Sequence, residues 1–568
     1  MNLLWIFLIT VLAQGAAPQQ PASVEGVVVK MGSGEPLPGV KVQLMLPSNM
    51  TAYTTTTTRE GKFLLEKVVP GTYRLVATST SSYVPAEYGQ RSVTGLGISF
   101  ALGSGQSMTG VQLAMAPTGS ISGRIYDRDG EPVGKAQVQA MRSIYKDGKR
   151  ELTIVQSVAT NDRGEYRLFW LPPGRYYVSA KPDIPEVLLN PGSAMVRITE
   201  PARFSTYEQA SSPVVKKRTL KSGEVVEETY MPVYYPGTLE MQDASAVAVA
   251  VGATISGIDV SVGAGLTSTH HISGRVINSR DGQPIARATV RAIPRSAGPM
   301  VIVPSAHSDS NGIFDIPGAA RGSYLLFATN NATTGMVPID VGNTDLHNIA
   351  IVATDGFKLP GRFVFEGRSP AGNDPKYSDL RIARLVRDPT ILGVSLAGPF
   401  FNRPTSPDGS FELEEVGVGD FRVTLQGLPT GAYIKSMRMG NADVLDGGLQ
   451  LRSAPENPLE IVISLEAGSI AGNVVNARGE PLPNRTVVLV PDVRLRHRND
   501  LFTTTVTNRS GQFQMQGLTP GDYKLFAWED VEAGAWQDPE FMRPQENSGL
   551  GVHVGEGSHA NVQLTVIP

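Results

Sequence analysis

The sequence predicts an all-β protein built as a string of about five β-sandwich domains. One observation is a repeat: at five places a glycine is followed ten residues later by a second glycine, and an aromatic residue stands two positions after each. The other is composition, because glycine (60) and proline (41) are abundant, as in turn-rich β structure. One unit has therefore been copied along the chain. The pairs are Gly61 and Gly71, Gly164 and Gly174, Gly312 and Gly322, Gly409 and Gly419, and Gly511 and Gly521.

The N-terminus, residues 1–15, reads as a signal peptide. The apolar run from Leu3 to Leu12 has the length of a signal-peptide core and is short for a membrane span, and the segment ends in a small-x-small cleavage pattern. No basic residue precedes the run, since the first is Lys30, so an uncleaved anchor or a misplaced start is the alternative. We expect an exported protein, periplasmic, secreted or associated with the cell surface, without a membrane span after signal cleavage.

Turn chemistry orders the elements within a copy, as the first copy illustrates. An apolar strand around Gly26 is followed by a turn, Gly34-Glu35-Pro36, where glycine takes the positive φ and proline withholds an N–H. Residues 40–44 then alternate apolar and polar, which is typical of a strand with one buried face. The strand between the two spaced glycines follows, and a closing hairpin brings the number of strands to about seven. The opening glycines of the five copies are Gly26, Gly123, Gly274, Gly361 and Gly472.

The fixed ten-residue spacing predicts a strand of about five or six residues between two tight turns. An extra residue there would turn every following side chain to the opposite face, so we expect no room for an insertion. A tyrosine after the second turn, such as Tyr73 or Tyr523, resembles the tyrosine corner of immunoglobulin-like sandwiches, whose hydroxyl bonds back to the backbone.

Together these residues resemble the carboxypeptidase regulatory-like domain, a transthyretin-like sandwich related to collagen-adhesin B-type modules and starch-binding-like folds. The resemblance covers about residues 22–568 and implies immunoglobulin-like or prealbumin-like sandwiches in a non-catalytic accessory or surface role, without implying one ligand. We expect five sandwiches, named here the first to fifth copies, at residues 22–116, 117–266, 267–353, 354–466 and 467–568. The second carries a long loop insertion at about 182–242, and the fourth is divergent because it lacks the Glu-Pro turn.

Composition and motifs argue against most chemistry. A net charge of −3 and a pI near 6.2 disfavour a nucleic-acid partner. The chain has no cysteine, nucleophile elbow, phosphate-binding loop or dinucleotide fingerprint, so we expect no enzyme and no cofactor. We expect no metal site either, because His270 and His271 would point to opposite faces of an extended chain. His553-x-x-Glu556 matches a zinc-binding spacing, but His553 falls where earlier copies have closing-hairpin residues.

The functional candidates are aromatic residues that we expect to be exposed in loops. They are Tyr230, Tyr234, Tyr235, Trp528 and Trp536. Aromatic faces stack on sugar rings, so they suggest a polysaccharide ligand or an envelope-protein partner bound through inter-strand loops. The alternative is that these rings plug one end of a sandwich or a joint between domains. The whole chain would then be a structural spacer without a specific ligand, and an undetected hydrolase is the third interpretation.

Overall fold

The structure is a computed structural model, and it confirms the all-β class. It describes residues 20–46, 51–79, 82–93, 95, 97–146, 148–182, 215–219, 223, 225–295, 303–330, 333–367, 376–387, 406–429 and 431–567. The predicted signal peptide and residues 183–214 of the predicted insertion lie outside these ranges. The chain divides into two compact units, Met1–Pro117 and Thr118–Pro568. In the described ranges no helix is long and apolar enough to cross a membrane.

The first unit holds the first copy, a two-sheet sandwich. One sheet has the order β4-β1-β8, and the other has the order β3-β2-β5-β6 with β7 also paired to β5. Val28, Leu44, Leu75 and Leu113 are at most 1% exposed and fill the space between the sheets. The strands are β1 (Ala22–Lys30), β2 (Lys41–Met45), β3 (Thr51–Thr56), β4 (Lys62–Val68), β5 (Gly71–Thr78), β6 (Ala86–Glu87), β7 (Ser99–Leu102) and β8 (Ser107–Met115).

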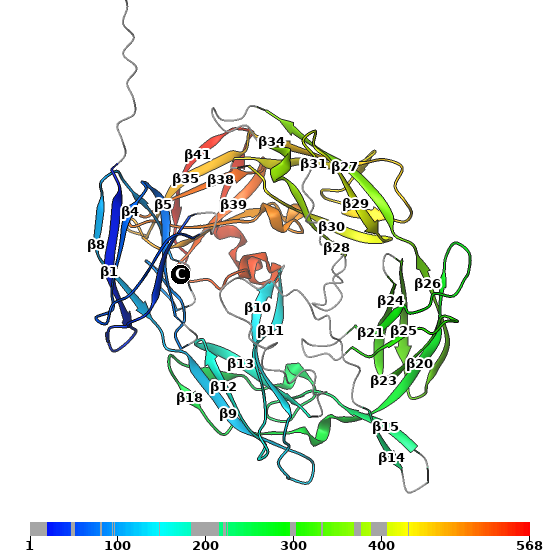
Figure 1. Cartoon of the computed structure of the whole chain (residues 1–568). Helices are drawn as coiled ribbons and strands as arrows, with labels where there is room; N and C mark the ends of the chain where they lie inside the picture. The colour runs from blue at the N-terminus through cyan, green and yellow to red at the C-terminus, as the bar shows by residue number, and fades with distance from the viewer. Residues whose placement is uncertain are drawn as a thin grey trace, which may run out of the picture. The chain divides into compact units, whose positions relative to one another are not determined.

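The second unit contains the other four copies (Figure 1). In the second copy, sheet β12-β9-β18, with β19 on β9, faces sheet β11-β10-β13-β16, with β17 on β13. Tyr166, Leu168, Tyr176 and Val178 belong to its core. The strands are β9 (Gly119–Tyr126), β10 (Gln137–Lys146), β11 (Lys149–Ala159), β12 (Glu165–Leu171), β13 (Gly174–Lys181), β16 (Val233–Tyr234), β17 (Val247–Val249), β18 (Thr254–Ile255) and β19 (Val260–Ser261).

A hairpin within the range predicted as an insertion extends the third copy. Strands β14 (Lys216–Thr219) and β15 (Val225–Tyr230) join a continuous sheet of order β14-β15-β20-β26-β25-β24-β21-β22, to which β23 adds by pairing with β20. The remaining strands are β20 (Leu266–Asn278), β21 (Thr289–Pro294), β22 (Ser305–His307), β23 (Ile313–Ala320), β24 (Gly322–Asn330), β25 (Thr333–Val341) and β26 (Leu346–Thr354).

The fourth and fifth copies each have two sheets. The fourth combines β29-β27-β34-β31-β32 with β28-β30-β33, and the fifth combines β38-β35-β41 with β37-β36-β39-β40. The fifth also has one short helix, α1 (Pro539–Met542). The strands are β27 (Phe357–Glu366), β28 (Arg381–Arg387), β29 (Ser410–Val416), β30 (Gly419–Gln426), β31 (Tyr433–Met439), β32 (Ala442–Asp443), β33 (Leu449–Leu451), β34 (Leu459–Ser464), β35 (Gly468–Val475), β36 (Thr486–Pro491), β37 (Thr503–Val506), β38 (Gln512–Leu518), β39 (Gly521–Trp528), β40 (Leu550–Val554) and β41 (His559–Thr565).

All five copies share one strand plan. The opening strand pairs antiparallel with the strand between the spaced glycines and parallel with a closing strand, as β1 does with β4 and β8. The same arrangement holds for β9, β20, β27 and β35. The division into five sandwiches at the expected boundaries stays a prediction, since the compact units number two.

The opening glycine is required by the closeness of the parallel closing strand. A Cβ at Gly26 would lie 2.0 Å from the carbonyl oxygen of Val111, and one at Gly274 would lie 2.0 Å from that of Ile349. The corresponding distance at Gly472 is 2.2 Å. A Cβ at Gly361 would lie 2.8 Å from the carbonyl oxygen of Leu459 on the parallel strand β34, and 2.1 Å from Cζ of Phe411 on β29. No side chain fits these positions without moving the neighbouring strand.

The expected length of five or six residues for the strand between the spaced glycines is wrong. The strands that follow the first glycine have seven or eight residues, and their pairing with the opening strand shifts register once. Six positions after each first glycine stands a residue with positive φ: Lys67 (57°), Trp170 (60°), Gly318 (80°), Glu415 (59°) and Gly517 (71°). A β-bulge therefore absorbs one residue within the constant spacing.

The tyrosine corner is confirmed in four copies. The hydroxyl of Tyr73 donates to the carbonyl of Val69 at 2.8 Å, and that of Tyr523 donates to the carbonyl of Thr519 at 2.8 Å. Tyr176 and Tyr324 make the same bond to the residue four positions earlier. The fourth copy has Phe421 at this place, which carries no hydroxyl.

Candidate functional site

The tyrosines between residues 230 and 235 belong to strands and a turn rather than to an open loop. Tyr234 lies in β16, paired with β13, and is 6% exposed. Tyr235 is partly buried and packs against the core of the second copy. Tyr230 ends β15, is partly buried, and has the Lys216 ammonium 5.1 Å from its ring centroid. Tyr234 therefore presents almost no surface to a ligand.

The two candidate tryptophans form a small second core in the fifth copy. Trp528 is 2% exposed and Trp536 is 8% exposed. The Trp528 ring stacks on Phe526 with centroids 5.2 Å apart and planes 6° apart, and Phe541 packs near it at 6.1 Å. This cluster lies on the face of β36 and β39 that points away from the main core, because Val488 and Val490 share it.

The expected exposure of the candidate aromatics is thus wrong for Tyr234, Trp528 and Trp536. Large rings on a sheet face are most stable when another segment covers them, and in the fifth copy α1 contributes the buried Met542 to this second core. The geometry agrees with the alternative in which these rings plug a sandwich. Ligand binding by the five aromatic residues stays an untested prediction.

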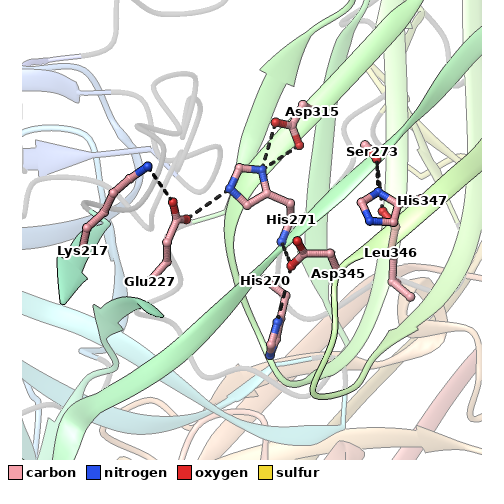
Figure 2. Close-up of polar contacts among 9 residues, drawn as sticks. All are labelled: Lys217, Glu227, His270, His271, Ser273, Asp315, Asp345, Leu346 and His347. Atoms are coloured by element: carbon pink, nitrogen blue, oxygen red, sulfur yellow. Dashed lines mark hydrogen bonds and ion pairs between the residues drawn. The ribbon is translucent and has the colours of Figure 1, made fainter. Parts of the chain in front are cut away.

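A cluster of polar side chains lies where the β14–β15 hairpin meets the third copy (Figure 2). The imidazole of His271 stands between two carboxylates. Its Nδ1 lies 2.8 Å and 2.9 Å from the two carboxylate oxygens of Asp315 on β23, and its Nε2 lies 3.1 Å from Oε2 of Glu227 on β15. His270 and His271 both lie within β20, whose early residues pair with β15 and β23.

The surroundings of His271 favour its charged form. Burial lowers the pKa of His271, but the hydrogen bonds and charges of Asp315 and Glu227 outweigh burial and raise this pKa above its usual value. Lys217 lies 3.2 Å from Oε1 of Glu227, on the side away from His271. Oδ1 of Asp345 accepts a hydrogen bond from the His271 backbone at 3.0 Å and lies 3.5 Å from Nδ1 of His270.

Chemistry at this cluster is limited by its geometry. In the described ranges, no group of three or more histidine, cysteine, aspartate or glutamate side chains is arranged to hold a metal ion. Ser273 and His347 lie 2.9 Å apart, a distance at which a histidine can activate a hydroxyl. In the part of the chain that the structure describes, no carboxylate forms an ion pair with His347, so the orienting third group of a triad has no counterpart there.

The His553-x-x-Glu556 pair separates into two unrelated contacts. His553 lies in β40, as its place in the repeat predicted, and its Nδ1 is 2.7 Å from Asp522. Glu556 accepts a hydrogen bond from the hydroxyl of Tyr433 at 2.8 Å and pairs with Lys435 at 3.1 Å. Both partners of Glu556 come from β31 of the fourth copy.

The fourth and fifth copies are consequently joined by more than the peptide chain. The peptide N–H of Gly557 donates to the carbonyl of Glu466 at 2.8 Å, and that of Ala467 donates to the carbonyl of Gly431 at 3.0 Å. Lys435 also pairs with Glu366 at 3.0 Å, so one ammonium links a carboxylate from each copy. Sequence reasoning missed this joint, because its residues follow no repeated pattern.

The fold defines a multi-domain β-sandwich protein. The family model of the carboxypeptidase regulatory-like domain matches residues 23–103 and 469–565. These two segments are therefore carboxypeptidase regulatory-like domains, a non-catalytic domain type, as the repeated motifs indicated. Colossin-A of Dictyostelium discoideum is 25% identical over 219 residues, which are 37% of this chain. The chain spans about 2% of the length of that curated relative.

The chain is similar to several solved structures, at low sequence identity and low TM-score. The Bacillus anthracis TIE protein is 11% identical with a TM-score of 0.14, over 93% of this chain and 68% of that one. GBS52, the minor pilin of Streptococcus agalactiae, is 12% identical with a TM-score of 0.21, over 42% and 94%. BcpA, the major pilin subunit of Bacillus cereus, is 11% identical with a TM-score of 0.14, over 59% and 99%.

Proposed function

We propose that this chain is an exported, non-catalytic structural protein whose consecutive sandwiches act as a spacer. The observation that carries the proposal is the joint between the fourth and fifth copies. β34 ends at Ser464 and β35 begins at Gly468, so the segment that connects the two copies is short. A spacer requires that neighbouring sandwiches keep a set orientation, whereas domains joined by a polar linker alone move freely.

The joint supports this role because several contacts between the fourth and fifth copies lie side by side. Glu556 receives the Tyr433 hydroxyl and the Lys435 ammonium, and two backbone hydrogen bonds flank them. The ion pairs are solvent-exposed, with 43% of both the Lys435 and the Glu556 side chains accessible, so each alone contributes little. Their effect on the joint is to restrict its orientation rather than to add much stability.

The joint can be tested by measuring its mobility. The absence of cysteine allows two unique spin labels, at Asn441→Cys in the fourth copy and Ser510→Cys in the fifth. We expect one narrow distance distribution between the labels, which Glu556→Gln combined with Tyr433→Phe broadens. Glu540→Gln, an exposed change elsewhere in the fifth copy, is the matched control and leaves the distribution unchanged. A broad distribution in the parent chain would remove the basis for a spacer.

Export is the second part of the proposal and rests on the apolar run from Leu3 to Leu12. We expect the protein recovered outside the cytosol to begin at Ala16, as measured by its intact mass. Recovery from the cytosol with Met1 retained would contradict export while leaving the spacer role open.

Binding of a polysaccharide or an envelope protein is a second candidate. Tyr230 and Tyr235 favour it, because both rings keep some exposed surface. We expect any glycan-array signal to fall on Tyr230→Ala, since an exposed ring supplies the stacking face. A signal that is unchanged by this substitution would assign binding to other residues, and hydrolysis of an array glycan would favour an enzyme instead.

A further inference from the structure

The β14–β15 hairpin is attached to the third copy along a short stretch only. Glu228, Thr229 and Tyr230 pair with the first residues of β20, and the ladder stops there. Glu227 is the next residue toward the hairpin tip, and it is the residue that contacts His271. The His271 contact therefore lies where the hairpin leaves the sheet (Figure 2).

Hydrogen-bond chemistry defines the protonation state that this contact needs. Both ring nitrogens of His271 lie within 3.1 Å of carboxylate oxygens, which only accept hydrogen bonds when ionised. A neutral imidazole has one N–H, so it can satisfy Asp315 or Glu227 but places a lone pair against the other. Only the imidazolium, which carries an N–H on each ring nitrogen, can donate to Asp315 and Glu227 at the same time.

We infer that His271 is a proton-operated latch: its imidazolium joins Glu227 of the hairpin to Asp315 of β23, and loss of the proton frees the outer end of the hairpin. The inference goes beyond the proposed spacer role. Docking of the hairpin can be measured whether or not the chain acts as a spacer, so failure of one leaves the other standing.

The charged groups around the latch come from each element packed against it. Glu227 is on β15, Lys217 behind it is on β14, and Asp315 is on β23. Asp345 precedes β26 and accepts the His271 backbone N–H, while His270 turns its ring toward Asp345 (Figure 2). On β26, His347 is bonded to Ser273 rather than to the latch.

The direction of the pH effect follows from the raised pKa of His271 in the docked state. Docking is fully favoured below the usual histidine pKa of about 6.5, and it is lost as the pH rises through the higher docked value. A single proton changes the docking equilibrium by at most about tenfold per pH unit within that window. The hairpin is therefore held in mildly acidic conditions and loosened in mildly alkaline ones.

The experiment follows the hairpin tip in the full chain by fluorescence energy transfer. Dyes are placed at Thr219→Cys on β14 and Val352→Cys on β26, both exposed positions in a chain without other cysteines. Transfer is measured from about pH 5.5 to about pH 9, the range in which histidine titrates. We expect a reversible transition with a midpoint above about 6.5.

Two variants and one control decide the outcome. His271→Gln abolishes the transition and holds the hairpin in its high-pH state throughout. Asp315→Asn also abolishes it but keeps the hairpin docked at high pH, because the amide can donate to a neutral imidazole whose other nitrogen donates to Glu227. His307→Gln, a change of an exposed histidine on β22, keeps the transition of the parent chain. Circular dichroism checks that each variant is folded. Transfer that is constant with pH in the parent chain, or a transition that persists in His271→Gln, would overturn the latch.

Discussion

The tight approach at the opening glycines gives a prediction that can be worked out in numbers. In Gly472→Ala the new Cβ would stand 2.2 Å from the carbonyl oxygen of Val562, whereas real Cβ contacts essentially never fall below 3.0 Å. β35 and β41 would have to separate by about 0.8 Å at this point. Their ladder runs from Ser469 to Val475, so relief of the contact stretches the hydrogen bonds on both sides.

The cost can be estimated from the bonds that such a separation weakens. Two or three interstrand hydrogen bonds at about 1 kcal/mol each, with the disturbed packing of the strand, give a loss of about 2–4 kcal/mol in the free energy of unfolding. Gly551→Ala in the same copy is the matched control. No atom would lie within 4 Å of its Cβ, and its φ is not in the left-handed region, so we expect less than about 0.5 kcal/mol.

Tryptophan emission reports this copy selectively in urea. Trp528 and Trp536 are buried within the fifth copy, while Trp170 is 39% exposed and Trp5 belongs to the predicted signal peptide. We expect Gly472→Ala to lower the urea midpoint of the emission transition without changing its slope. An unchanged slope would show that stability is lost, and that the compactness of the native and denatured states is not altered. A midpoint equal to that of Gly551→Ala would refute the argument that the glycine is needed for close strand approach.

Three further predictions concern hydroxyl groups. Tyr523→Phe should cost the fifth copy about 1 kcal/mol, measured by the same urea transition, because it removes one hydrogen bond to backbone. Thr57→Val should lower the thermal midpoint of the first copy. The buried Thr57 hydroxyl joins two backbone groups at 2.7 Å and 2.9 Å, and its loss costs about 1–3 kcal/mol. The control Thr54→Val, at an exposed position, should change the midpoint little. Burial raises the pKa of Tyr176, Tyr324 and Tyr523 to about 12, so their contribution to stability is full below about pH 10 and is lost as the pH rises from about 10 to about 12. Phenolate absorbance should show these tyrosines ionising after the exposed ones.

The repeated features of the fold were predictable because they depend on turn-forming residues at fixed spacing. Glycine and proline spacing located the turns and the strand class, and Tyr73 with its counterparts predicted the corner. The bulge was not predictable, since the residues at its positive φ include Lys67, Trp170 and Glu415, whose side chains give no local signal for that conformation. A hydroxyl four positions before each first glycine could have indicated the Thr57 bridge, because Thr160, Ser308, Thr405 and Thr507 stand at the same place.

The candidate sites were predicted less well, for a physical reason. An aromatic residue in an irregular stretch can be exposed or can cap a sheet face, and its sequence surroundings are similar in both cases. Trp528 and Trp536 are buried because another segment folds over them, and Tyr234 is buried because β16 adds to the sheet of the second copy. The His271 cluster joins β15, β20 and β23, so its members are far apart in the sequence and share no spacing motif.

The distribution of repeated and unrepeated residues indicates where any specific function must lie. Among the described residues, the repeated ones have internal tasks: the opening glycine admits a carbonyl, the tyrosine bonds four residues back, and the hydroxyl before the first glycine bridges two backbone groups. The His271 latch, the Glu556 joint and the tryptophan cluster instead draw on segments that occur once. Because copying preserves what every sandwich requires, a property of the whole chain has to come from the residues that differ between the copies.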